Sequence, residues 1–393
     1  MRALLDQLSL RTKMLFIAAV SAGLSLIPSG LFVRDGMARV AQAQKEALGV
    51  PASVELLQLV RSTQQHRGLA SGVLNGNQAA RADREAVAKS IQARFATLSP
   101  SIVAIGAQGL AVRLDEMRQQ LTQLIEDVGK QSLKAPESLS RHNAIVERQM
   151  DLIYDVTVAS ELVLHPDASG YFLQDGILRA LPPVTEALGR MRAMGNGALT
   201  RKEISALERA QIAALATQAR TLSVQVERSI QLAIKADPSL QASLTTELQD
   251  AMRQIREGVD YVDKRLLSAE TLDEPPAQWF ARTTAIIDAQ FKLATVGAKA
   301  LQADMDEGVV SMQRALWVGS TGMVVLTALS LWLILAVGRR VTDATSEALR
   351  LAEAVAQGDL TRQVQAQGQD ECARMLRALD GMARNLSTTV SSV

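Results

Sequence analysis

A cluster of polar residues early in the chain carries side chains that can hold a small anion. Gln64, His66 and Arg67 stand within four positions of one another, and Gly68 and Gly72 follow them. Arginine presents a planar fork of N–H donors that can grip a planar oxyanion, while glutamine and histidine add neutral donors. Glycines beside them let neighbouring helices approach and leave room for a ligand. The pattern is compatible with a buried anion site on a helix.

The same residues also suit the polar end of a helix. Arg67 and His66 near a last turn can satisfy free backbone carbonyls, and glycine commonly ends a helix. The helical pattern runs through Leu74 and stops at the Asn-Gly-Asn run of residues 75–77, which is a turn signal. The residue types alone therefore leave two interpretations of Arg67 open, an anion contact and a helix cap.

A weak internal repeat supplies a candidate partner for Arg67. The stretch "HRGLASGVL" has Arg67 five residues before Gly72, and "MRAMGNGAL" has Arg192 five residues before Gly197. Chance similarity of this length is common in chains rich in alanine, glycine and leucine. If the repeat is structural, Arg192 is the second arginine of the site.

The elements that must position these residues are predicted to be helices. The chain has 393 residues, of which 48% are hydrophobic but only 3% aromatic, a mixture that favours helix. Between residues 34 and 314, apolar residues recur at three- and four-residue spacing between turn signals. These signals include Asn75-Gly76-Asn77, Ser99-Pro100, His165-Pro166, Gly195-Asn196-Gly197, Asp237-Pro238 and Pro275-Pro276. About eight helices result, which suggests an all-α fold with two four-helix bundles.

Two apolar runs are long enough to cross a membrane. Residues 14–33 and 315–337 contain no charged side chain, and a helix needs roughly 20 apolar residues to span the hydrocarbon core. The first run could instead be a cleaved signal peptide, but it is long for one and no A-x-A site directly follows it. Trp317 and Trp332 stand near the ends of the second run, as in an interfacial belt. We predict two transmembrane helices.

Basic residues indicate the orientation of these helices. They lie outside both apolar runs, as Arg2, Arg11 and Lys13 before the first and Arg339 and Arg340 after the second. Positive flanks stay in the cytoplasm. We therefore expect residues 1–13 and 338–393 to be cytoplasmic and residues 34–314 to be exported. The lone Cys372 then falls on the reducing side of the membrane.

Composition excludes several classes of protein. The formal charge of +1 gives no basis for nucleic-acid binding, and the single Cys372 excludes a disulfide framework or a multi-cysteine zinc site. His66, His142 and His165 are scattered, and no nucleophile motif is visible. We expect no enzyme activity, no cofactor and no bound metal.

The opening cluster resembles the first helix of nitrate- and nitrite-sensing domains. In "LLQLVRSTQQHRGLASGVL", Arg67 and Gly68 match that family's Arg-Gly pair, whereas His66 and Ala70 stand where the family has Glu and Ser. The resemblance covers one motif of about 20 residues. It implies paired four-helix bundles that hold the anion between arginines of two helices. Gln64, His66 and Arg67 are thus expected ligand contacts, with Arg192 added from the repeat.

A second stretch, "LVLHPDASGYFLQDGIL", resembles a segment of exported helical sensor regions in proteobacterial chemoreceptors. Pro166 should end one helix, and Asp167 or Ser169 can cap the next by accepting from free N–H groups. His165 stands where the family has Asp. It has no cysteine or carboxylate at metal-ligand spacing, so we expect no metal there.

The last segment, residues 338–393, resembles a HAMP linker. Two short coiled-coil seams run through Val341, Ala344, Ala348, Leu351 and Val355, and through Cys372, Met375, Leu379, Met382, Leu386, Thr389 and Val393. Gly358, Leu360 and Val364 match the connector between them, and Asp370 and Glu371 match the acidic pair that opens the second helix. The proline usual near the start of the first helix is absent. The resemblance implies a parallel four-helix coiled coil in a homodimer.

Together these features resemble the input portion of a methyl-accepting chemotaxis protein in a bacterial inner membrane. We expect the periplasmic domain to bind a small ligand, possibly nitrate or nitrite, and the second span and HAMP linker to relay the signal. The output module, which would engage a chemotaxis kinase and adaptor, is absent from this sequence, so the chain is expected to be a fragment. The alternative is the input half of a sensor histidine kinase or a cyclic-dinucleotide synthase.

Overall fold

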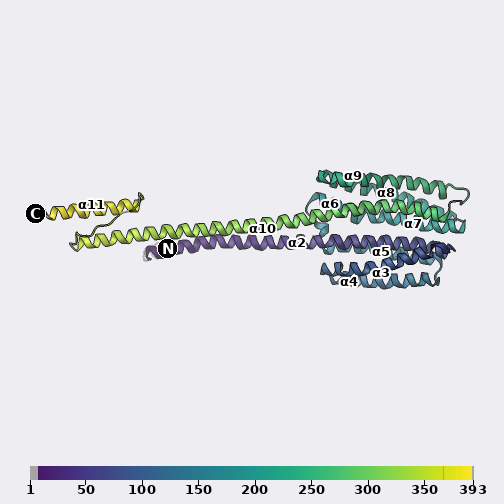
Figure 1. Ribbon diagram of the computed structural model, residues 1–393, viewed down its shortest axis with the longest axis horizontal. Coiled ribbons are helices and arrows are strands. Elements are labelled where there is room, and N and C mark those ends of the chain that lie inside the picture. Colours follow the sequence, from purple (N-terminus) through teal and green to yellow (C-terminus); the bar gives the residue numbers. More distant parts are fainter. Residues whose placement is uncertain (1–7, 366, 392–393) are drawn as a thin grey trace. The chain divides into compact units, whose positions relative to one another are not determined.

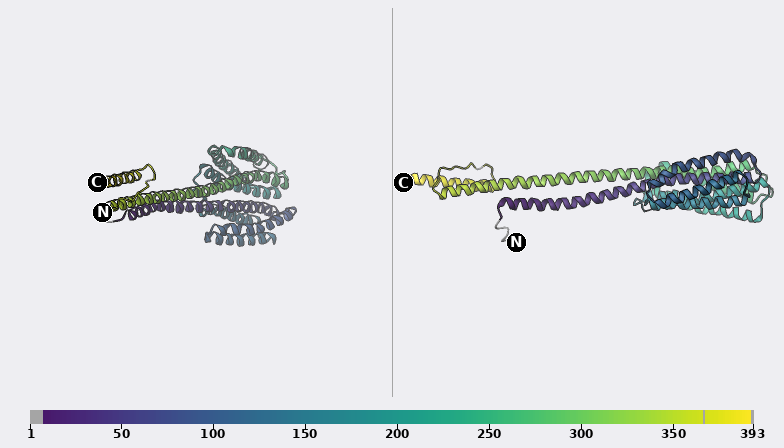
Figure 2. Two further views of the ribbon diagram at one scale, coloured as in Figure 1. Left: turned by 60° about the vertical axis from the view of Figure 1, so that its left-hand side comes forward. Right: turned by 90° about the horizontal axis from the view of Figure 1, so that it is seen from below.

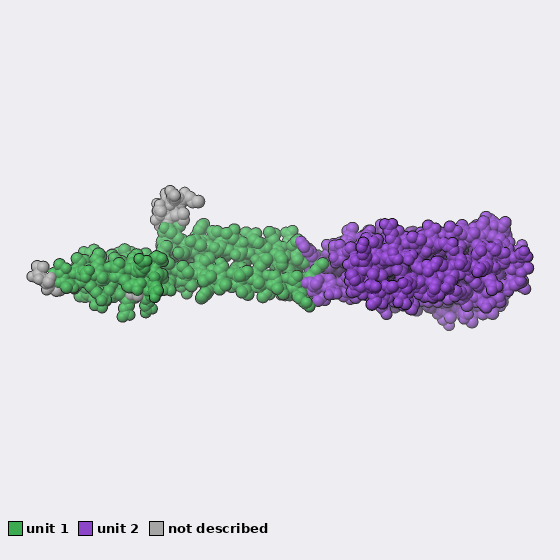
Figure 3. Space-filling model, turned by 90° about the horizontal axis from the view of Figure 1, so that it is seen from above, with its two compact units in different colours: residues 1–38, 312–393 green, residues 39–311 purple. Residues whose placement is uncertain are grey.

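The computed structural model describes residues 8–365 and 367–391, and over these residues the chain is helical and contains no strand (Figure 1). The predicted all-α class is confirmed. Arg2 and Val393, which entered the predictions of orientation and of the second seam, lie outside the described residues. The structure divides into two compact units, residues 39–311 and residues 1–38 with 312–393 (Figure 3). Helices α2 (Leu10–Leu74) and α10 (Pro276–Ala356) contribute to both units.

In the unit formed by the chain ends, two apolar helix segments lie side by side. Glycines mark where they touch, because Gly319 packs against Phe32 and Gly338 packs against Met14; small residues let apolar helices approach closely. The apolar windows of α2 and α10 contain almost no buried residues, unlike the core helix of a soluble protein. Among the described residues these two helices are long and apolar enough to cross a membrane.

At the C-terminal end of this unit an irregular segment separates α10 from α11. Gly358 has φ +86°, a left-handed conformation that glycine adopts without strain, and it follows the end of α10. Asp370 accepts a hydrogen bond from the Ala373 amide at 2.9 Å at the start of α11 (Glu371–Ser391). The Val364 amide donates to Asp380 Oδ1 at 3.2 Å, which ties the connector to α11.

The buried stripe of α11 differs from the predicted seam by one position. The buried apolar residues of α11 are Ala373, Leu376 and Ala383. Met375 and Met382 of the predicted seam are instead 40% and 46% exposed. Helix α11 has two adjacent apolar stripes, and the sequence pattern could not show which one packs within the chain.

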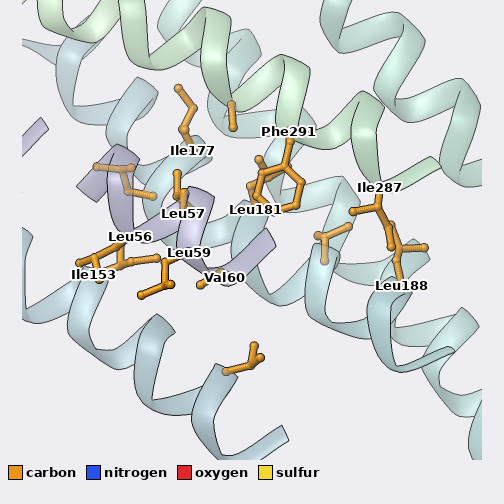
Figure 4. Close-up of a cluster of buried hydrophobic side chains, with 14 of the residues drawn as sticks. Leu56, Leu57, Leu59, Val60, Ile153, Ile177, Leu181, Leu188, Ile287 and Phe291 are labelled. Atoms are coloured by element: carbon orange, nitrogen blue, oxygen red, sulfur yellow. The ribbon is translucent and has the colours of Figure 1, made fainter. Parts of the chain in front are cut away.

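In the other unit, residues 39–311, helices α3 (Arg81–Ala104), α4 (Gln108–Gly129) and α5 (Ala135–Ala159) pack in sequence, as do α7 (Leu181–Arg201), α8 (Ala206–Ala236) and α9 (Gln241–Val262) (Figures 1 and 2). Side-chain hydrogen bonds join α2 to α3 and α5, and they join α10 to α7 and α9. A short helix α6 (Ala168–Gln174) and a π-helical turn (Asp175–Ala180) lead into α7. One continuous hydrophobic core joins the two groups. Figure 4 shows Leu56 and Leu59 of α2 near Ile153 of α5, whereas Leu57 lies toward Ile177 and Leu181.

Several expected breaks lie inside helices. Helix α7 runs through Gly195-Asn196-Gly197 and α3 runs through Pro100. The glycines of α7 serve packing, since Gly195 lies against the indole ring of Trp279 and Gly197 lies against Ser71. The expected cap of α6 is also wrong, because Asp167 precedes that helix but makes no capping side-chain bond.

Candidate functional site

The centre of residues 39–311 contains a buried ion pair between α2 and α7. The guanidinium of Arg67 meets Glu186 through two bonds, Nη1–Oε1 at 2.6 Å and Nη2–Oε2 at 3.0 Å. Its Nη1 also donates to Asn143 Oδ1 at 2.7 Å. Gly189 makes this possible, because a methyl group there would stand 2.7 Å from Arg67 Nη2. Both charged groups are buried, so the pair is shielded from water.

Gln64 connects this ion pair to a second arginine. Its side-chain Nε2 donates to Glu186 Oε2 at 3.1 Å, and its backbone carbonyl accepts from Arg192 Nη2 at 2.9 Å. Gln64 and Arg67 lie three positions apart on α2, and Glu186 and Arg192 lie six apart on α7. The three-residue spacing places Gln64 and Arg67 on one face of α2, whereas the six-residue spacing turns Arg192 about 120° around α7 from Glu186. The crossing of α2 and α7 therefore assembles the cluster.

Arg192 is a buried cation without a carboxylate partner. Its guanidinium donates to Gln64 O and to Thr284 Oγ1 at 2.8 Å, and it lies 4.9 Å from the centre of the Phe280 ring. Among the described residues no carboxylate forms an ion pair with it, and its Nε has no hydrogen-bond partner. Burial, and next the charge of Arg67, lower the pKa of Arg192 to about 9. The group is therefore still charged at pH 7.

The structure brings together three of the four residues expected at the site, namely Arg67, Gln64 and Arg192. It contradicts the helix-cap interpretation of Arg67, because α2 continues to Leu74 and the guanidinium reaches Glu186. His66 points elsewhere. Its Nδ1 lies 2.8 Å from Nε2 of His142 on α5, so it does not join Arg192.

The two histidines form a chain of hydrogen bonds inside the first group of helices. His142 Nδ1 donates to the Ser138 carbonyl at 2.7 Å, so its Nε2 accepts from His66 Nδ1, and His66 Nε2 faces Arg84 Nη1 at 3.4 Å. This order requires neutral rings. Burial lowers the pKa of His66 well below 6.5, and it lowers the pKa of His142 to about 3. Both rings are therefore neutral at pH 7.

A second histidine cluster joins α2 to α10. His165 Nδ1 lies 3.0 Å from Glu46 Oε2, and its Nε2 lies 3.6 Å from Asp304 Oδ2. Burial opposes the charge of this imidazole, but the nearby carboxylates of Asp304 and Glu46 outweigh it and raise its pKa above 6.5. Sequence spacing could not reveal these carboxylates, which lie 119 and 139 positions away.

Sequence reasoning missed Glu186, Asn143 and Thr284. Glu186 is the one acidic residue between Gly176 and Lys202, and an isolated carboxylate in a largely apolar helix was the available signal. Asn143 and Thr284 carry no motif. Each becomes recognisable only through its distance to a guanidinium.

Comparisons with known proteins indicate the family and the fold of the chain. The family model described as nitrate and nitrite sensing matches residues 58–302, a stretch that contains Gln64, Arg67, Glu186 and Arg192. No curated protein matches the chain. The structure titled "Structure of the NasR transcription antiterminator" is similar over 91% of this chain and 98% of that chain, with a TM-score of 0.56 and 16% identity. At this identity the likeness shows the fold alone.

Proposed function

The chain belongs to the nitrate and nitrite sensing family, and from this premise we propose that Arg192 and Arg67 bind nitrate, nitrite or a similar small oxyanion. The observation that carries the proposal is the buried Arg192, whose positive charge lacks a carboxylate and whose Nε lacks an acceptor. Burying an uncompensated charge is costly. An oxyanion would supply both the charge and the acceptor.

We further propose that the protein is a membrane receptor. Arg67 lies on α2, and the contacts of Arg192 include Phe280 and Thr284 of α10. These two helices also contain the apolar segments. A ligand that binds one packing of these helices better than another shifts the equilibrium between the two packings. Such a shift in α2 or α10 would be carried along the same helix toward its apolar segment.

The proposed output path runs through residues 338–393, a HAMP-like linker in a homodimer. The exposed stripe of Met375, Met382 and Leu386 on α11 supports this proposal, since a second copy would cover it. On this basis the chain is the input portion of a chemoreceptor in a bacterial inner membrane, with residues 34–314 in the periplasm and a kinase and adaptor downstream. The input half of a sensor histidine kinase remains the second candidate.

Binding can be tested through Trp279. Its indole is fully buried, and its Nε1 donates to the Arg192 carbonyl at 3.0 Å, so its emission should report on the site. The full chain with Trp317→Phe and Trp332→Phe leaves Trp279 as its one tryptophan. We expect nitrate and nitrite to change its emission in a saturable way and Arg192→Met to abolish the change.

Arg220, an exposed arginine of α8, provides the control, and Arg220→Met should respond like the parent protein. No response of the parent protein to either anion at millimolar concentration would refute the proposed ligand class.

A further inference from the structure

We infer that Glu186 sets the charge selectivity of the site: by neutralising Arg67 it leaves a single positive charge, so that the site accepts monovalent oxyanions and rejects divalent ones. This inference rests on the proposed function, and it concerns a residue that would not itself need to touch the anion. Three charged groups, Arg67, Arg192 and Glu186, are buried together at the crossing of α2 and α7.

Glu186 occupies the two terminal nitrogens of Arg67, which leaves the Nε of Arg67 as its free donor. Its two carboxylate oxygens take Nη1 and Nη2, and Gln64 adds a further donor to Oε2. Such a two-point pair is the strongest form of a charge-assisted hydrogen bond. The carboxylate is also buried, so water screens its charge little. Arg67 is thereby neutralised before any ligand arrives, although its Nε remains without a partner.

Arg192 contributes the charge that remains. The carboxylate of Asp288 acts on it from a distance, but Asp288 is partly exposed and pairs with Arg61 at 2.7 Å. Arg190 lies at the rim, where its Nε is 3.5 Å from Glu186 and its Nη2 is 3.6 Å from Glu147. The buried set of Arg67, Arg192 and Glu186 therefore carries one net positive charge.

This charge discriminates between anions that offer similar acceptors. Nitrate and sulfate both present oxygens to N–H donors, but nitrate carries one negative charge and sulfate carries two. Nitrate would bring the buried set to neutrality, whereas sulfate would leave it with a net negative charge in a poorly solvated place. We expect the site to exclude sulfate on charge.

Glycine at position 68 lets α2 approach the guanidinium of Arg192 closely. A methyl group on Gly68 would stand 3.2 Å from Arg192 Nε and 2.8 Å from the Phe280 ring. The absence of a side chain therefore allows the unpaired Nε to lie directly against α2.

The test is Glu186→Gln in the full chain, titrated with sodium nitrate and sodium sulfate through the Trp279 emission. Glutamine keeps an oxygen for Arg67 but removes the negative charge, so the buried set carries two positive charges. We expect the ratio of sulfate affinity to nitrate affinity to rise at least ten-fold. The control is Glu147→Gln, an exposed carboxylate near Arg190, which should leave the ratio unchanged.

A double variant, Arg67→Met with Glu186→Met, separates charge selection from a purely structural role. It removes both members of the pair and restores one net positive charge, so nitrate should again be preferred even if both affinities fall. A structural role for Glu186 predicts instead that Glu186→Gln weakens both anions equally.

The outcomes keep this inference distinct from the proposed function. An unchanged affinity ratio in Glu186→Gln, with nitrate still bound by the parent protein, refutes charge selection and leaves the anion site standing. If the parent protein binds neither anion, the proposed function fails and the inference fails with it.

Discussion

Arg192→Met and Arg67→Met should change the free energy of unfolding by very different amounts, although the two arginines are similarly buried. Arg67 is paired, so Arg67→Met leaves the buried Glu186 carboxylate with only the partly exposed Arg190, 3.5 Å away, as a cationic partner. Breaking a buried pair in this way costs about 3–5 kcal/mol. Arg192 has no carboxylate partner, so its removal leaves no opposite charge behind.

The magnitude for Arg192 follows from its environment. A pKa of about 9, against 12.5 for an ordinary arginine, means that its charged form costs about 5 kcal/mol in the folded protein, at about 1.4 kcal/mol per pH unit. Arg192→Met removes this cost but also loses two hydrogen bonds from a charged group, worth about 1.5–3 kcal/mol each. We expect the free energy of unfolding to change by less than about 2 kcal/mol.

The assay is urea unfolding of the full chain in detergent at pH 7, in a buffer without oxyanions, followed through the Trp279 emission. Nitrate at a hundred times its Kd should stabilise the parent protein by about 2.7 kcal/mol and should not stabilise Arg192→Met. The control Arg220→Met should stay within about 0.5 kcal/mol of the parent protein. The reasoning is refuted if Arg192→Met unfolds as readily as Arg67→Met, or if nitrate stabilises it as much as the parent protein.

Three further predictions concern other parts of the chain. Burial lowers the pKa of both His66 and His142 in the folded protein below 6.5. Below pH 6.5 the unfolded chain therefore binds more protons than the folded protein. The free energy of unfolding should fall as the pH drops, by at most about 1.4 kcal/mol per pH unit for each histidine. Urea midpoints between pH 7.5 and 5 should show this slope, and replacing both residues by glutamine should flatten it; an equal slope in that variant would contradict the assignment. Leu379→Asp should weaken the dimer expected through α11, seen as loss of crosslinking through Cys372 in membranes, whereas crosslinking equal to that of the parent chain would count against this interface. A reporter fused at residue 200 should be active in the periplasm and one at residue 360 in the cytoplasm, and the reverse pattern would overturn the proposed orientation.

Local sequence patterns predicted the elements and part of the site. Apolar runs without charges mark the two membrane-competent segments, because roughly 20 predominantly apolar residues in a helix are long enough to cross the hydrocarbon core. Three- and four-residue spacing predicted helices, because that spacing forms one face of a helix. The Arg-Gly pair and the weak repeat directed attention to Arg67 and Arg192, and the structure places both in one buried cluster with Gln64.

Only the tertiary structure decided the partners of these residues. Glu186 neutralises Arg67, whereas Arg192 remains unpaired, and this difference depends on distances between α2, α7 and α10 that no local pattern encodes. The same limit explains the errors at Gly195 and Gly197, which appear as breaks in the sequence but leave room for Trp279 and Ser71 in the structure. His66 stands beside Arg67 in the chain, yet the two side chains leave α2 on different faces, one toward His142 and the other toward Glu186. The sequence determined which groups are present, and the packing of the helices determined which charges meet, because electrostatic energy depends on separation and burial in space.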